Sequence, residues 1–200
     1  MTLDRRQALR TLALGSVGAV AAPAWAENLV ELARDHAEHA PAAPAAAGEA
    51  VAWTPKVFDA HQNDTVVVLS ELIIPQTDTP GARAAKVNEF IDLVLSSADQ
   101  AERKQFLKGL AWMDGRSQEL FGADFASAAP DQQTALLTIL ASPKNKAFED
   151  QLGIDFFNAF KAMTITGYYT SEIGMKQELG DDGQLFLLEY PGCAHPQHKA

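Results

Sequence analysis

"NKAFEDQLGIDFFNAFKAMTITGYYT", residues 145–170, is the stretch that decides the fold. Its large apolar side chains recur at intervals of three or four residues: Phe148, Leu152, Phe156, Phe160 and Met163. This spacing places them on one face of a helix. Gly167 and the glycine-rich turns after it interrupt the pattern. The stretch therefore predicts a long amphipathic helix in the C-terminal half of the chain.

Two earlier segments follow the same rule. "AAKVNEFIDLVLSSA", residues 84–98, has an apolar stripe at i, i+3, i+4, i+7 and i+8: Val87, Phe90, Ile91, Val94 and Leu95. Asp99 and Glu102 have the spacing of a capping box and are expected to open the next, longer helix. The apolar face of that helix consists of Phe106, Leu107, Leu110, Met113 and Leu120.

A third segment, "NDTVVVLSELIIP" at residues 63–75, is less distinct. Its start offers the cap-forming residues Asn63 and Asp64, and Pro75 cannot continue a helix. Its three consecutive valines also permit a strand. The helical spacing of three later residues favours a helix: Leu69, Leu72 and Ile73.

The remaining segments complete an all-α pattern. "PDQQTALLTILAS", residues 130–142, begins with a proline that fits a first helical turn, and Pro143 closes it. No stretch alternates convincingly over several strands. We expect an irregular all-α bundle of about five or six helices, with "GQLFLLEYPGC", residues 183–193, as an extended C-terminal tail.

The N-terminus has the three parts of a signal peptide. Residues 4–26 read "DRRQALRTLALGSVGAVAAPAWA", with a basic head, an apolar run from Thr11 to Ala22 and the small-x-small pattern Ala24-Trp25-Ala26. The run is shorter than the ~20 residues that a membrane-spanning helix needs. We expect residues 1–26 to be a signal peptide that is cleaved after Ala26.

The paired arginines Arg5 and Arg6 resemble the bacterial twin-arginine signal. That resemblance implies export by a translocon that passes folded proteins. An ordinary secretory signal whose two arginines fell together is the alternative.

Residues 27–52 are expected to be an Ala/Pro-rich linker. Within them, "AEHAPAAPAAAGEA" at 37–50 has few bulky apolar side chains that could fix a conformation. The preceding "NLVELARDHAEHA", residues 28–40, could form a short helix when docked. The helical domain then covers residues 53–200.

The chain is acidic. It has 16 basic and 26 acidic residues in 200, a formal net charge of −10. Removal of residues 1–26 takes away three arginines and one aspartate, which leaves 13 basic and 25 acidic residues and a net charge of −12. This balance argues against nucleic acid and anionic lipid as partners.

The sequence carries no motif for a cofactor. It has no GxxxxGK[ST], HExxH or CxxCH, and "GSVG", the nearest approach to a dinucleotide fingerprint, lies in the signal peptide. One cysteine cannot hold an iron–sulfur cluster without ligands from another chain. We therefore expect no catalytic residue, no metal and no cofactor in this chain.

The single cysteine, Cys193, leaves three readings open. A bond to another chain, a soft-metal site with His195 and His198, and an uninvolved thiol are all compatible with the sequence. The other histidines are expected to be solvated: His36, His39 and His61. Asp181 and Asp182 are expected in a solvated turn, with calcium as the alternative.

"TGYYTSEIG", residues 166–174, invites an acid–base reading of the run from Tyr168 to Glu172. Sequence neighbours on a helix do not face one another, however. We expect Tyr168 and Tyr169 to seal a core or to form an interface with a partner.

Four stretches together resemble the gluconate 2-dehydrogenase subunit 3 family, the small or gamma subunits of periplasmic flavin-dependent dehydrogenases. They are "LSELIIPQTDTPGARAAKVNEFIDLVL" (69–95), "KGLAWMDGRSQELFGADFASAAPDQQTALLTIL" (108–140), "FFNAFKAMTITGYYTSEIGMKQELG" (156–180) and "YPGC" (190–193). The most specific pieces are "IIPQTDTPGA" (73–82) and "TGYYTSEIG" (166–174).

The resemblance implies a non-catalytic accessory subunit. Its partner would be a flavoprotein large subunit of the glucose-methanol-choline oxidoreductase type, in some complexes with a multihaem cytochrome c subunit. The family implies FAD in the partner, with haem c or an iron–sulfur cluster as further options there. The large subunit would cross the membrane folded, carried by the small subunit's signal, and Cys193 matches the "GC" ending where a bond to the large subunit is plausible.

Two other hypotheses stay open from the residues alone. One is an independent periplasmic enzyme that uses the Tyr168–Glu172 region or a metal at the C-terminal histidines. The other is a free-standing binding or chaperone protein with a helical groove.

Overall fold

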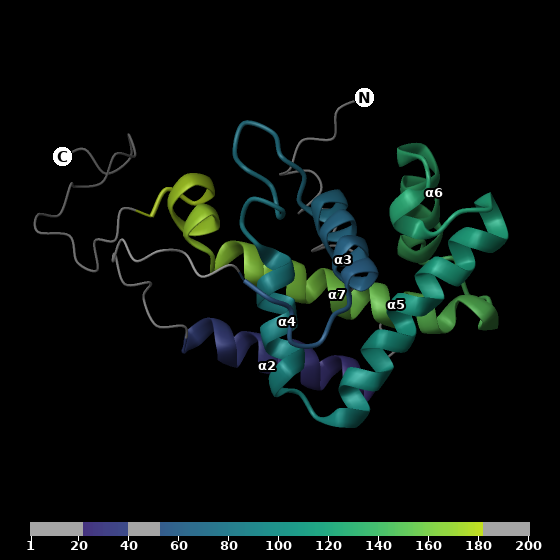
Figure 1. The fold of residues 1–200 in the computed structure, drawn as a ribbon, viewed down its shortest axis with the longest axis horizontal. Helices are drawn as coiled ribbons and strands as arrows, with labels where there is room; N and C mark the ends of the chain where they lie inside the picture. Colours follow the sequence, from purple (N-terminus) through teal and green to yellow (C-terminus); the bar gives the residue numbers. More distant parts are fainter. Residues whose placement is uncertain (1–21, 40–52, 182–200) are drawn as a thin grey trace, which may run out of the picture.

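The computed structural model describes residues 22–39 and 53–181. Within them the chain forms six α-helices and three short helical segments, and no strand (Figure 1). The α-helices are α2 (Ala24–Glu38), α3 (Ala60–Ile73), α4 (Val87–Ser97), α5 (Gln100–Phe121), α6 (Pro130–Ala141) and α7 (Gln151–Tyr169). The short segments are the 3-10 turns η1 (Phe125–Ser127) and η2 (Phe148–Asp150) and the π-helical η3 (Ile173–Glu178). The predicted irregular all-α bundle is confirmed, and the predicted tail at 183–193 lies outside the described residues.

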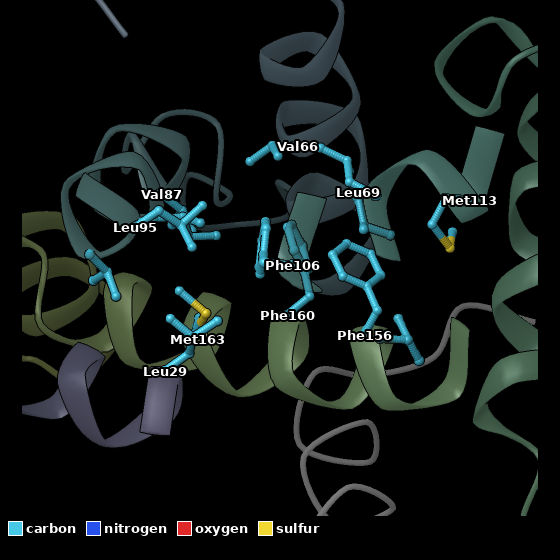
Figure 2. Close-up of a cluster of buried hydrophobic side chains, with 14 of the residues drawn as sticks. Leu29, Val66, Leu69, Val87, Leu95, Phe106, Met113, Phe156, Phe160 and Met163 are labelled. Carbon is cyan, nitrogen blue, oxygen red and sulfur yellow. The ribbon is translucent and has the colours of Figure 1, made fainter. Parts of the chain in front are cut away.

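Helix α7 is the central element. It packs against each of the other α-helices described here, and Figure 1 shows it running lengthwise through the molecule. The predicted stripe holds for Phe156, Phe160 and Met163, which are fully buried. Phe106 of α5 packs edge-on against Phe156 with ring centroids 5.1 Å apart, and Phe156 lies 5.6 Å from Phe160 (Figure 2). The repeat in residues 145–170 therefore supplies the surface on which the bundle assembles.

Phe148 departs from the predicted stripe. It lies in η2, before α7 begins, and its side chain is 93% exposed. The helical interval continues through the sequence, but the backbone at residues 148–150 forms a 3-10 turn, which places the ring in solvent. The end of the helix also differs, because α7 passes through Gly167 and continues to Tyr169.

The starts of α5 and α6 lie where the sequence predicted them, whereas the start of α3 does not. The capping box of Asp99 and Glu102 is present, with the Asp99 carboxylate accepting from Ala101 N–H at 2.7 Å, and Pro130 opens α6. Helix α3 begins at Ala60, ahead of the predicted Asn63 or Asp64. Asp59 is its cap and forms a capping box with Gln62.

The linker expected at 27–52 is wrong for its first part. Residues 24–38 form α2, which packs against α4, α5 and α7. Leu29 and Ala33 are fully buried and Ala26 is 2% exposed. A short helix over residues 28–40 was expected only on docking, and here it buries one apolar face against three other helices. Residues 40–52 lie outside the described part.

Each helix within residues 22–39 and 53–181 is too short or too polar to cross a membrane.

Candidate functional site

The loop between α3 and α4, residues 74–86, is fixed by one carboxylate. Glu71 of α3 accepts from Gln76 N–H at 2.8 Å and from Arg83 N–H at 2.8 Å. One side chain thus holds both the outgoing and the returning parts of the loop. Backbone bonds complete the closure, with Ala82 N–H donating to Ile74 O at 2.9 Å.

Gly81 leaves the space that this arrangement needs. A Cβ atom there would lie 2.5 Å from both Gln76 N and Glu71 Oε1. Those distances are well inside van der Waals contact, so a side chain would push the carboxylate off the loop. The glycine of "IIPQTDTPGA" is therefore required by the close approach of Glu71.

The loop is attached to the far end of the chain's central helix. The Tyr168 hydroxyl of α7 donates to Pro80 O at 2.7 Å, although 88 positions separate the two residues. The Thr79 hydroxyl donates to the Glu178 carboxylate in η3. The two most specific pieces of sequence, 73–82 and 166–174, thus meet in one place. We call this place, made of loop 74–86, the C-terminal end of α7 and η3, the junction.

A tight turn links α7 to η3 within the junction. The Ser171 hydroxyl donates to Tyr168 O at 2.6 Å and accepts from Gly174 N–H at 3.0 Å. Gly174 packs directly on that carbonyl, since a Cβ there would lie 2.0 Å from Tyr168 O. The turn directs η3 back toward Thr79.

The polar residues of "TGYYTSEIG" serve this turn and do not converge on one point. Thr170 donates to Thr166 O at 2.7 Å, and Glu172 pairs with Lys176 at 2.8 Å, which lowers the pKa of the Glu172 carboxyl. The Tyr168 ring is fully buried and lies edge-on to Tyr169, with centroids 5.2 Å apart. Of the two tyrosines proposed for an interface, Tyr168 therefore belongs to the core and Tyr169 is half-buried beside it.

The outer side of the junction is partly apolar. Met175 on η3 is 41% exposed, and Leu179, the residue directly after η3, is 63% exposed. Pro75 to Asp78 of the loop are exposed as well. In Figure 1 the long loop after α3 and the yellow η3 lie at the same end of the molecule. This end exposes two large apolar side chains, Met175 and Leu179, beside a loop that hydrogen bonds hold in place, and we treat it as a candidate contact surface.

Two polar sites escaped sequence reasoning. Asp92 of α4, 1% exposed, accepts backbone N–H groups from Lys56, Val57 and Phe58 at 2.8, 2.9 and 3.2 Å. An aspartate inside an apolar stripe was the available signal. The Asp92 carboxylate fixes residues 56–58, which precede α3, to α4.

The second is an ion pair between α3 and α5. His61 Nε2 lies 2.7 Å from Asp114 Oδ2, and the other Asp114 oxygen accepts from Phe125 N–H at 3.0 Å. The hydrogen bond to Asp114 raises the pKa of His61, with further contributions from Asp124 and Asp59. His61 was expected to be solvated; half of its side chain is exposed, but the ring is paired.

Two hollows and the possible metal ligands of the described residues bear on whether a small molecule or ion could bind. One hollow of about 310 Å³ lies open between the middle of α2 and the start of α5, lined mostly by polar side chains such as Asn28 and Glu102. A smaller one of about 80 Å³ lies at the start of α7. Across 22–39 and 53–181 no group of three His, Cys, Asp or Glu could hold a metal.

Several predicted residues fall outside the described part: Arg5, Arg6, Asp182, Cys193, His195 and His198. Ala26, the expected cleavage residue, lies in the first turn of α2 and is buried. His36 and His39 lie near the end of the same helix, where His39 Nδ1 is 2.8 Å from Asp35 O.

The fold and the junction define a small all-α protein in which a long inter-helix loop is fixed to the end of the central helix. A family model, Gluconate 2-dehydrogenase subunit 3, matches residues 60–182. The match covers more than half of the chain, from α3 to the end of η3 and including the whole junction. The chain belongs to the gluconate 2-dehydrogenase subunit 3 family, as its sequence indicated. Comparisons with curated proteins and with solved structures gave no match.

Proposed function

We propose that this chain is the non-catalytic accessory subunit of a periplasmic, FAD-dependent sugar or sugar-acid dehydrogenase. It carries the flavoprotein large subunit through twin-arginine export and stabilises it afterwards. The observation that carries the proposal is the family match over residues 60–182. The partner is a flavoprotein of the glucose-methanol-choline oxidoreductase type, with a multihaem cytochrome c subunit as a further member in some complexes.

The chemistry of the chain supports an accessory role. The Tyr168 and Ser171 hydroxyls, and the Glu71 carboxylate next to the first specific segment, hold the junction together. These groups are engaged in hydrogen bonds that fix the backbone of the junction, an arrangement that suits a structural role better than a reaction centre. In this proposal FAD, and any haem c or iron–sulfur cluster, belong to the partner subunits.

The N-terminal sequence supports the export step. A translocon that passes folded proteins suits a passenger that binds its cofactor before export. Arg5 and Arg6 form the twin-arginine motif that the translocon recognises, and the complex then resides in the periplasm. Any association with the membrane would run through a partner.

Co-purification tests the accessory role. The full chain, tagged after Ala200, is purified from the periplasm of a bacterium that also expresses a large subunit encoded beside it. We expect a flavoprotein to co-elute, with FAD absorbance and dehydrogenase activity in that subunit. An active periplasmic large subunit obtained without this chain would overturn the proposal, and a stoichiometric metal with turnover in the isolated chain would favour an enzyme instead.

A matched pair of variants tests the route. In R5K/R6K the pair keeps its charge but loses the guanidinium groups that define the signal. We expect both this chain and the large subunit to stay in the cytoplasm. R10K makes the same exchange outside the pair and is expected to leave both proteins in the periplasm. Normal export of R5K/R6K would indicate the ordinary secretory route.

A disulfide between Cys193 and the large subunit is part of the proposal. Non-reducing electrophoresis of the purified complex should show one band that separates into two on reduction. C193S should abolish that band while the two subunits still co-elute. Two separate bands from the wild-type complex without reductant would remove the disulfide and leave the accessory role standing.

A further inference from the structure

The position of helix α2 bears on where the signal peptide is removed. The small-x-small pattern ending at Ala26 would place the cut between Ala26 and Glu27. A second small-x-small pattern, Ala19-Val20-Ala21, ends five residues earlier. The sequence alone accepts both sites, and α2 distinguishes them.

The bond after Ala26 lies inside folded structure. Helix α2 begins at Ala24, and Pro23 O accepts from Ala26 N–H at 2.8 Å and from Glu27 N–H at 3.2 Å. Ala26 is 2% exposed, and Trp25 packs against the core beside it. Proteolysis is concentrated where backbone is exposed and free of hydrogen bonds. A cut after Ala26 would require the first turn of α2 to unwind and Ala26 to leave the core.

The bond after Ala21 involves no part of α2. Ala22 is exposed and precedes the cap residue Pro23, and the first-turn bonds of α2 shown among the described residues run to Pro23 O. A cut there leaves the helix, its cap and the Trp25 contact complete.

The new amino terminus also has a complementary site at residue 22. Ala22 and Asp155 line the same small hollow at the start of α7, together with Gln151. Asp155 accepts from Gln151 Nε2 at 2.8 Å, and within the described residues no basic side chain forms an ion pair with it. Its desolvation raises the pKa of the carboxyl. Lys146, the other charged residue of the hollow, is exposed and can extend into solvent.

An amino terminus at Glu27 lacks these features. The α-ammonium group would stand in the first turn of α2, at the positive end of the helix dipole, where a cation is unfavourable. Removal of residues 22–26 would also delete the carbonyl that accepts from this first turn.

We propose that the signal peptide is removed after Ala21, so that the mature chain begins at Ala22 with its α-ammonium group beside Asp155. The inference rests on the proposed export step. Because that step delivers an already folded chain, α2 is formed when the signal peptidase meets it.

The N-terminal residue of the exported protein tests the inference. The tagged full chain is purified from the periplasm together with its large subunit and sequenced from the amino end, with intact mass as a second reading. We expect Ala22. A chain that starts at Glu27 overturns the inference and leaves the export proposal intact. A periplasmic chain that still carries its first residues also overturns it, and a chain found only in the cytoplasm contradicts the export proposal itself.

Two variants separate the sites. A21Q places a large polar residue at the end of the first small-x-small pattern, and A24Q does so at the start of the second. Ala24 is exposed on α2, so glutamine fits there without entering the core; Ala26 is avoided because it is buried. We expect A21Q to accumulate as precursor and A24Q to be processed to Ala22 as in the wild type. The reverse pattern would place the cut after Ala26.

Discussion

At the scale of single residues, Asp92 is the strongest test of the fold. Its carboxylate satisfies three backbone N–H groups while almost fully buried. D92A leaves these donors without an acceptor, and we expect a loss of roughly 3 kcal/mol in the free energy of unfolding. Urea denaturation measures it. D64A removes an exposed aspartate from α3 and should change stability by no more than about 0.5 kcal/mol; equal losses in both variants would contradict the role of Asp92.

His61 predicts a dependence of stability on pH. Its pKa is raised in the folded protein above 6.5, chiefly by the hydrogen bond to Asp114. The charged pair therefore stabilises the fold in full below the unfolded pKa, and this contribution is lost as the pH rises through the folded pKa. Since 49% of the His61 side chain is exposed, the effect should stay below about 1 kcal/mol.

The measurement compares the wild type with H61Q over a pH series. The wild type should be the more stable at about pH 6, and the difference should shrink toward about pH 8.5. A difference that grows with pH would reverse the sign and contradict the assignment. Sequence reasoning could not foresee this pair, because His61 and Asp114 are 53 positions apart and neither stands in a motif.

At the scale of elements, the loop 74–86 depends on Gly81. In G81A the new methyl group meets Gln76 N and Glu71 Oε1 at 2.5 Å, so the loop must move away from α3. We expect a loss of about 2 kcal/mol on unfolding in urea. G115A is the matched control: that glycine lies within α5 with nothing within 4 Å of an added Cβ. Alanine there should stabilise the helix by up to about 1 kcal/mol, and a stabilised G81A would show that the loop is not held as described.

Helix α2 gives the second prediction at this scale. Two mature forms are compared, one beginning at Ala22 and one at Glu27. The shorter form lacks Trp25 and Ala26, which pack into the core, so we expect it to be less stable by about 2 kcal/mol in urea. D155N should weaken the longer form slightly and leave the shorter one unchanged. Equal stability of the two forms would show that the first turn of α2 contributes nothing to the bundle.

The elements also show where sequence reasoning succeeds. Helices α4, α5 and α7 were predictable because each carries its own apolar stripe, and α5 and α6 carry their own start signals in Asp99 and Pro130. Helix α2 was predicted only as a short helix that forms on docking, because its stability depends on helices far along the chain. Phe148 was wrongly predicted to belong to the buried stripe. Its spacing fits a helix, but spacing alone does not determine the residue at which the helix begins.

At the scale of the whole molecule, the junction forms because the fold brings two specific sequence segments, 73–82 and 166–174, into contact. Each specific segment was visible in the sequence, but nothing in either one indicates that Tyr168 reaches Pro80. The bundle brings them together because α3 and α4 both pack on α7, which carries the loop between them to the end of that helix. The location of the candidate surface therefore follows from the fold, whereas its chemistry could be read from the residues.

This location predicts which end of the molecule the proposed flavoprotein partner binds. Leu179 and Phe148 are both exposed apolar residues, at 63% and 93%, and they lie beyond opposite ends of α7. A helix of 19 residues is about 28 Å long, so the two positions sample separate surfaces. L179D places a charge on the junction and should reduce the amount of co-purified large subunit at least about tenfold. F148D makes the same change at the other end and should leave the amount of co-purified large subunit unchanged.

Both substitutions are at the surface, and thermal unfolding of the isolated chain checks that each variant is folded. Loss of the large subunit in F148D alone would move the contact to the start of α7, and loss in neither variant would show that the surface around Leu179 is not part of the interface.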